Sequence, residues 1–171
     1  MRRILNALFL AIFVFLSGCS GEGAEKGTIL LRDVEFSYSG PLDVGANTSQ
    51  YEWSLNPKDQ LRMWTDKSEI KTAKLVAATI HDADEYEFDG VNSLVLSLSS
   101  DNADLSMAEI AVLNPLKGKS NKQELNLAQE AEIDDYFQES MMYILLDAGL
   151  AEAIDDDMKL TADLTFEVTY D

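Results

Sequence analysis

The sequence predicts an all-β fold: an antiparallel β-sandwich of about seven to nine strands, with one short helix near residues 131–139. The strongest support comes from residues 158–170, where apolar side chains at even positions alternate with polar side chains at odd positions. Such alternation is typical of a half-buried strand with one face toward solvent. Shorter segments repeat the pattern, and turn-forming pairs separate them. Many short strands between turns favour a sandwich.

The remaining strands are predicted from the same alternation of apolar and polar residues. In chain order, the predicted strands cover residues 33–38, 51–55, 74–80, 93–99, 109–113 and 125–127. Pairs that favour turns lie between them, namely Gly40-Pro41, Asn56-Pro57, Asp89-Gly90, Asn114-Pro115 and Lys117-Gly118. Glycine favours turns because it can adopt positive φ, and proline favours them because its ring fixes φ at about −65°.

The segment 131–153 allows two interpretations. Ile133, Tyr136 and Phe137 have helical spacing, which predicts the short helix at 131–139. The apolar run that follows fits either a buried strand or a continued helix. We expect a hairpin, with Met141–Asp147 as its first arm, residues 158–170 as its second arm and Asp155–Asp157 as its solvated tip. The alternative is one helix over 131–153, which would make the fold α+β.

Composition excludes several classes of protein. The 171 residues include 13 Lys and Arg against 31 Asp and Glu, which gives a net charge of −18. Such an acidic chain has no basic stripe for a phosphate backbone, so no nucleic-acid partner is expected. With one cysteine and one histidine, intramolecular disulfides and zinc sites made of several Cys or His residues are excluded. The length fits a single domain.

The first residues have the composition of a secretory signal peptide. Arg2 and Arg3 precede an almost wholly apolar run, Ile4–Leu16, and the small residues Ser17 and Gly18 follow it. This run is shorter than the roughly 20 apolar residues that span a bilayer, so a permanent transmembrane helix is not expected.

Leu16-Ser17-Gly18-Cys19 resembles the lipobox of bacterial lipoprotein precursors. The resemblance implies cleavage between Gly18 and Cys19 and attachment of diacylglycerol, with palmitate-type acyl chains, to the Cys19 thiol. It also implies a cell-envelope location, and Ser20 resembles a residue that sorts lipoproteins to the outer membrane. The predicted organisation is therefore a signal peptide at 1–18, a flexible lipidated tether at 19–27 and one sandwich domain at 28–171.

The predicted mature form keeps 153 residues and is more acidic than the precursor. Its loss of Arg2 and Arg3 leaves 11 bases against 31 acids, a net charge of −20. The order of its predicted strands and its Ile-Asp-Asp-Tyr-Phe segment resemble small uncharacterised β-sandwich lipoproteins of Gram-negative bacteria. That resemblance implies a fold and no mechanism.

No catalytic residue or cofactor is predicted. His81 precedes Asp82, but the chain has no Gly-x-Ser-x-Gly nucleophile and its one thiol belongs to the lipobox. The nearby acidic run contains Asp82, Asp84, Glu87 and Asp89, which could offer oxygen ligands to calcium. Its spacing does not follow the EF-hand loop, so a solvated acidic loop is predicted there, with a calcium site as the alternative.

One stretch differs from the rest in charge and aromatic content. Tyr51, Trp53, Arg62 and Trp64 lie close together in a locally basic part of an acidic chain. They form the predicted partner surface, because aromatic and arginine side chains are enriched at interfaces. The alternative is that Tyr51 and Trp53 point into the core.

These observations predict a lipid-anchored, non-enzymatic module that binds or helps to assemble another component of the envelope. Two alternatives stay open: a lipoprotein that binds a glycan or calcium, and a small envelope hydrolase. The expected partners are the membrane, through the lipid, and another envelope protein.

Overall fold

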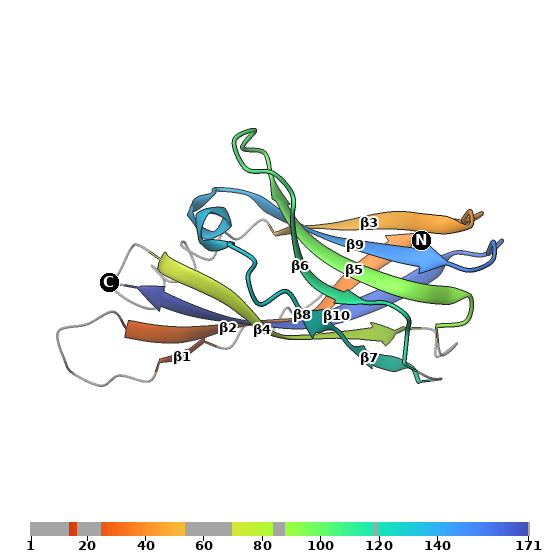
Figure 1. Cartoon of the computed structure of the whole chain (residues 1–171), viewed down its shortest axis with the longest axis horizontal. Helices are drawn as coiled ribbons and strands as arrows, with labels where there is room; N and C mark the ends of the chain where they lie inside the picture. Colours follow the sequence, from red (N-terminus) through yellow and green to blue (C-terminus); the bar gives the residue numbers. More distant parts are fainter. Residues whose placement is uncertain (1–13, 17–24, 54–69, 84–87, 118–119, 171) are drawn as a thin grey trace, which may run out of the picture.

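The computed structural model describes residues 14–16, 25–53, 70–83, 88–117 and 120–170. It confirms the all-β prediction: two antiparallel sheets form the two layers of a sandwich (Figure 1). Within these ranges, ten strands and one 3-10 helix are present. The count exceeds the predicted seven to nine because β1, β7 and β8 are only two or three residues long. A strand of two or three residues is too short to show the alternation of apolar and polar side chains from which strands are predicted.

The first sheet has a 13-residue strand at its centre. Its order is β1 (Val14–Leu16), β2 (Glu25–Tyr38), β10 (Met158–Tyr170), β4 (Ile70–Asp82) and β7 (Lys122–Glu124). All of its neighbours pair antiparallel. The predicted strand at 158–170 is thus β10, and it pairs along its length with β2 on one side and β4 on the other.

The second sheet lies face to face with the first. Its order is β3 (Gly45–Trp53), β9 (Met142–Leu150), β5 (Val91–Ser100), β6 (Ala108–Leu113) and β8 (Asn126–Leu127). The predicted strand at 125–127 is divided between the sheets: β7 pairs with β4, and β8 pairs with β6. Leu125 lies between them and is buried, which marks the point where the chain crosses the core.

The core lies between the two sheets, where the apolar side chains of the alternating strands meet. On β10, Leu160, Leu164 and Phe166 are buried, as the alternation predicts. Phe166 contacts Trp53 and Phe137, with ring centroids 5.9 Å and 5.3 Å away. Edge-to-face and tilted rings of this kind are favourable aromatic pairs.

The short helix is present and the longer alternative is wrong. Asp134–Gln138 forms a 3-10 helix, whereas Met142–Leu150 is strand β9, so no helix covers 131–153. Asp134 Oδ1 accepts a hydrogen bond from the Ala73 amide at 2.6 Å, and Phe137 is buried. This packing against β4 fixes one helical turn and ends it, so the apolar run that follows is free to form a strand.

The predicted hairpin of Met141–Asp147 with residues 158–170 is wrong. Both segments are strands, but β9 pairs with β3 and β5, whereas β10 pairs with β2 and β4. The connection at 151–157 therefore crosses from one sheet to the other. The alternation of apolar residues fixes the buried face of each strand but not the strand it pairs with, and here each strand contributes its buried face to the common core from a different sheet.

The predicted tether at 19–27 is too long. Strand β2 begins at Glu25, so Glu25, Lys26 and Gly27 belong to the first sheet. Cys19 and residues 20–24 lie outside the described residues. In the part of the chain that the structure describes, no helix has the length and hydropathy to cross a membrane.

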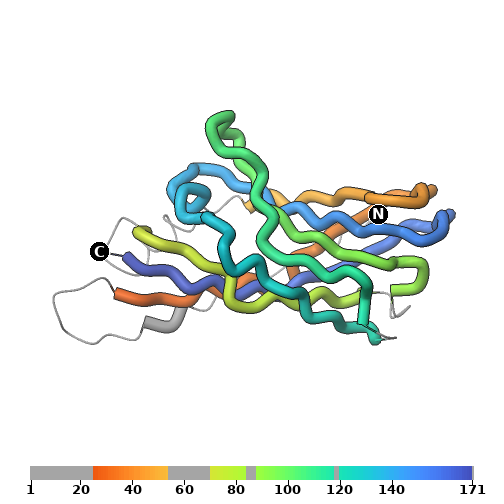
Figure 2. The backbone as a smooth tube through the Cα atoms, viewed as in Figure 1, coloured from red at the N-terminus to blue at the C-terminus, as the bar shows by residue number. Residues whose placement is uncertain are grey.

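The two ends of the sandwich are defined by the strand register. Glu25, Tyr170 and Ile70 lie together where β2 starts, and we call this the tether end. Tyr38, Met158 and Asp82 lie together where β2 finishes, and we call this the cleft end. Twelve steps of about 3.3 Å along β10 separate the two ends by about 40 Å. The backbone path in Figure 2 shows this elongated arrangement.

Candidate functional site

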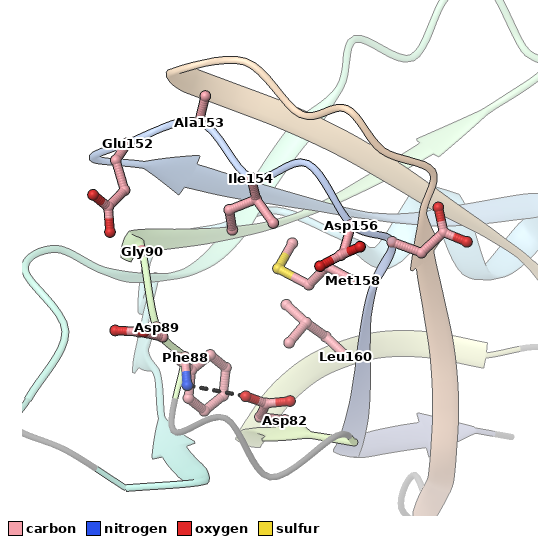
Figure 3. A pocket seen from close by; sticks show the side chains of 11 residues that line it. Asp82, Phe88, Asp89, Gly90, Glu152, Ala153, Ile154, Asp156, Met158 and Leu160 are labelled. Atoms are coloured by element: carbon pink, nitrogen blue, oxygen red, sulfur yellow. Dashed lines mark hydrogen bonds between the residues drawn. The ribbon is translucent and has the colours of Figure 1, made fainter.

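A cleft of about 630 Å³ opens at the cleft end of the sandwich (Figure 3). Two parts of the chain form it: Asp82 at the end of β4 with residues 88–90 before β5, and residues 151–157 between β9 and β10. Its lining combines acidic and apolar side chains: Asp82, Phe88, Asp89, Glu152, Ile154, Asp156, Asp157, Met158 and Leu160, with Gly90 and Ala153. The volume lies within the range of pockets that bind small ligands or a side chain of a partner.

The first wall is formed by Asp82 and Phe88, which a hydrogen bond joins. Asp82 is the last residue of β4 and only 8% exposed, and its Oδ2 accepts a hydrogen bond from the Phe88 amide at 3.0 Å (Figure 3). Phe88 has φ +58°, which costs a non-glycine residue about 1–2 kcal/mol. Its carbonyl accepts from the Val91 amide at 2.9 Å. These two hydrogen bonds hold the Phe88 ring in the cleft.

The second wall is the crossing connection at 151–157, which three backbone contacts hold. Ile154 exchanges two hydrogen bonds with Leu42, and the Ala151 amide donates to the Gly90 carbonyl at 2.8 Å. Asp157 Oδ1 accepts from the Gly40 amide at 2.9 Å. The connection is therefore tied both to the β2–β3 turn and to the first wall, so the cleft is formed before any ligand arrives.

The charge of the cleft has one sign. Among the described residues that line it, five are acidic and none is Lys, Arg or His. The apolar floor, made by Phe88, Ile154, Met158 and Leu160, lowers the local dielectric and strengthens the field of the carboxylates. A cationic group with an apolar neighbour matches this lining in charge and polarity.

The structure brings together only part of the predicted acidic loop. Asp82 and Asp89 both line the cleft, whereas Asp84 and Glu87 lie outside the described residues. Within the described ranges, no three His, Cys, Asp or Glu side chains are arranged to hold a metal ion. One oxygen of the Asp82 carboxylate instead accepts a hydrogen bond from the Phe88 amide.

The predicted partner surface requires a correction at Trp53. This residue is 1% exposed and packs against Phe137 and Phe166, so it belongs to the core. Tyr51 is half-buried on β3 and packs against the same core, and burial raises the pKa of its phenol. Arg62 and Trp64 lie outside the described residues. The alternative interpretation, in which the Trp53 side chain points into the core, is therefore confirmed.

His81 faces a different group of residues from the cleft. Its Nε2 lies 3.6 Å from Asp163 Oδ2, and the same oxygen accepts a hydrogen bond from Arg32 Nη1 at 3.0 Å. This cross-strand cluster, formed on β2, β4 and β10, places a cation beside the carboxylate. It has the geometry of a surface ion pair.

Sequence reasoning identified both acidic runs of the cleft but did not place them together. Asp155–Asp157 was expected at a hairpin tip, and the structure places Asp156 and Asp157 against the cleft instead. Phe88 and Ile154 carry no distinguishing signal, because single apolar residues in loops are common, and Met158 is predicted only as one more apolar position of the strand at 158–170. The crossing of the chain between sheets brings the two loops to one end, and no local pattern encodes it.

Comparisons with known proteins add little. Neither a family model nor a curated protein matches the sequence. Among solved structures, a chain from Desmodium yellow mottle tymovirus is similar, with 14% identity and a TM-score of 0.30. The match covers 91% of this chain and 93% of that chain.

Proposed function

We propose that this protein is a lipid-anchored, non-enzymatic module of a bacterial cell envelope, and that it binds another envelope protein in the cleft. The lipobox Leu16-Ser17-Gly18-Cys19 supports the anchor, and Ser20 supports the outer membrane as its location. Two acyl chains, at about 0.8 kcal/mol per buried CH₂, would hold the protein stably.

The position of the cleft carries this proposal. Strand β2 begins at the tether end, six residues after Cys19, and the cleft lies at the opposite end of the first sheet. A protein anchored at Cys19 can therefore present the cleft about 40 Å from its point of attachment to the sheet. A lipid would hold the protein at the membrane and leave the cleft free for a partner.

The chemistry of the cleft indicates the kind of contact. Five carboxylates beside an apolar floor fit a Lys or Arg side chain followed or preceded by an apolar residue. The opposing charge would raise the rate of encounter with a basic partner, and the apolar floor would add affinity once water is displaced.

The anchor is tested by labelling cells with palmitate and measuring the intact mass of the mature protein. We expect a labelled protein that starts at Cys19 and carries diacylglycerol, and no label in the Cys19→Ser variant. A labelled Cys19→Ser variant, or a wild-type protein that keeps residues 1–18, would contradict the anchor.

The cleft is tested by mild crosslinking in intact membranes, followed by purification of the anchored protein and mass spectrometry. We expect one partner near stoichiometry with the wild type, and a loss of about tenfold or more with Asp89→Asn, Glu152→Gln and Asp156→Asn combined. The matched control combines Asp104→Asn, Glu109→Gln and Glu132→Gln, which removes three exposed acids outside the cleft lining. Equal capture by both triple variants would exclude the cleft as the binding site.

A further inference from the structure

A strand that precedes Cys19 covers part of one edge of the first sheet. Val14–Leu16 forms β1 and pairs antiparallel with Gly27–Ile29 of β2, with Val14 opposite Ile29 and Leu16 opposite Gly27. On its other side β2 pairs with β10. Cleavage before Cys19 would remove β1 and leave β2 as the edge strand of the sheet that the described residues form.

The vacated edge would offer two things to an incoming strand. Backbone N–H and C=O groups that face β1 would lose their partners, and such a row is a template for strand pairing. The same stretch also borders the core: Gly27 and Ile29 are buried, Ile29 at 1% exposure, whereas Thr28 is half-buried on the other face. A strand at this position would therefore gain both hydrogen bonds and apolar contact.

Beyond this stretch, the edge of β2 is less suited to pairing. Asp33 has φ +53°, and the register with β10 shifts between Ala162 and Leu164, which marks a bulge. Arg32 is exposed beside it and pairs with Asp163. Bulges and charged side chains are the usual protection of an edge against added strands. Pairing would therefore be confined to the part of β2 near the tether end.

We propose that in the mature lipoprotein this edge, Gly27–Ile29, pairs with an extended, uncharged segment of another envelope protein, an inference that rests on the proposed cleavage before Cys19. The chain itself shows the chemistry of the occupant, since the uncharged sequence Val-Phe-Leu of β1 takes this place antiparallel to β2. An acidic segment would be repelled by a mature chain of net charge −20.

A second copy of the protein is not the strand that pairs with Gly27–Ile29. Two β2 edges paired antiparallel would point the two cleft ends in opposite directions, and with them the two lipid anchors. If one copy stands upright on its tether, the cleft end of the other copy extends about 40 Å toward the membrane. The tether from Cys19 to Glu25 spans at most about 20 Å, so this end would have to enter the membrane. The partner segment must in turn reach this edge within a short distance of the membrane surface.

The test uses the mature lipidated protein in detergent micelles and a synthetic peptide as the probe. The peptide carries residues 12–17, Ile-Phe-Val-Phe-Leu-Ser, with an uncharged polyethylene glycol tail for solubility. In the control peptide prolines replace the residues equivalent to Val14 and Phe15. Neighbouring residues of a strand direct their N–H groups to opposite sides, so one of the two prolines removes an N–H that faces β2.

Amide hydrogen exchange is the measurement. We expect the first peptide to slow exchange at Gly27–Ile29 by about tenfold or more and the proline peptide to leave it unchanged, with β3 unaffected by either. A photo-crosslinking residue at Thr28 should form an adduct with a partner in cells. In isolated membranes, the first peptide added before irradiation should prevent this adduct. The same residue at Thr165, on the central strand β10, should form none.

The outcomes separate this inference from the proposed function. If the protein is cleaved and lipidated at Cys19 but neither peptide slows exchange at Gly27–Ile29, the edge is not a docking site and the anchor stands. Equal slowing by both peptides would show non-specific hydrophobic binding without strand pairing and would also overturn the inference. A purified protein that still contains residues 14–16 would overturn both, because β1 would keep its place.

Discussion

The tether end and the cleft end of the sandwich are built from the same strands but differ in what fills them. Toward the tether end, Trp53, Phe137 and Phe166 pack ring against ring inside the core. At the cleft end, β10 begins with half-buried Met158, and five acids surround an open space of about 630 Å³. The comparison indicates that apolar packing stabilises one end, whereas the other end keeps an accessible, charged surface at some cost in stability.

Two substitutions on β10 test this contrast most strongly. Phe166→Ala should lower the free energy of unfolding by about 3–5 kcal/mol, because it leaves a cavity between two other rings. Met158→Ala, on the same strand and the same face, should cost about 1–2 kcal/mol, since its side chain is half-buried beside the cleft. Urea unfolding followed by circular dichroism measures both. Equal costs would show that the two ends contribute alike to the stability.

The cleft end has a steric requirement of its own at Gly40. A Cβ at this position would lie 2.5 Å from the Asp155 carbonyl oxygen and 2.7 Å from that of Asp156. Gly40→Ala should therefore separate the β2–β3 turn from the 151–157 connection and lower stability by about 1–3 kcal/mol. Thermal unfolding measures the change, and Ser39→Ala, at the exposed neighbouring position, is the control. An unchanged melting temperature for Gly40→Ala would mean that the two loops separate freely.

The main strands are predicted by local patterns, whereas the cleft is not. Alternation along residues 158–170 predicted β10 because one face of a strand must be apolar to join a core. The division of residues 122–127 between two sheets and the crossing from β9 to β10 depend on contacts between residues far apart in the chain. The same holds for Trp53: its aromatic character suggested an interface, and only the burial of its ring shows that it belongs to the core.

Tyr38 links the two sheets near the cleft end, and its contribution should depend on pH. Its hydroxyl donates to the Leu146 carbonyl at 2.8 Å, and burial, with the nearby Asp147 carboxylate, raises the pKa of this phenol above its ordinary value. Tyr38→Phe should lower the free energy of unfolding by about 1 kcal/mol at neutral pH, because Leu146 loses its donor.

Above the ordinary tyrosine pKa of about 10, the unfolded wild type releases the Tyr38 proton while the folded protein keeps it. The stability that Tyr38 provides is thus complete below pH 10 and declines as the pH rises. The difference between wild type and Tyr38→Phe should therefore shrink between pH 9 and pH 11, by up to about 1.4 kcal/mol per pH unit above pH 10. Urea unfolding across this interval measures it, and a constant difference would show that Tyr38 ionises in the folded protein as it does in the unfolded chain.

The smallest expected effect has the opposite sign and concerns the acids of the cleft. Asp89, Glu152 and Asp156 line one cleft, so their carboxylates repel one another. Combined replacement by Asn, Gln and Asn should raise the free energy of unfolding by up to about 1 kcal/mol at low salt, and this gain should vanish near 1 M salt, where the screening length falls to about 3 Å. The control variant, with Asp104, Glu109 and Glu132 neutralised, should gain less, because those acids do not share a cleft. If the cleft variant loses stability at low salt, the acids stabilise the fold. The contrast between an end stabilised by packing and an end that keeps its charge at a cost in stability would then have to be abandoned.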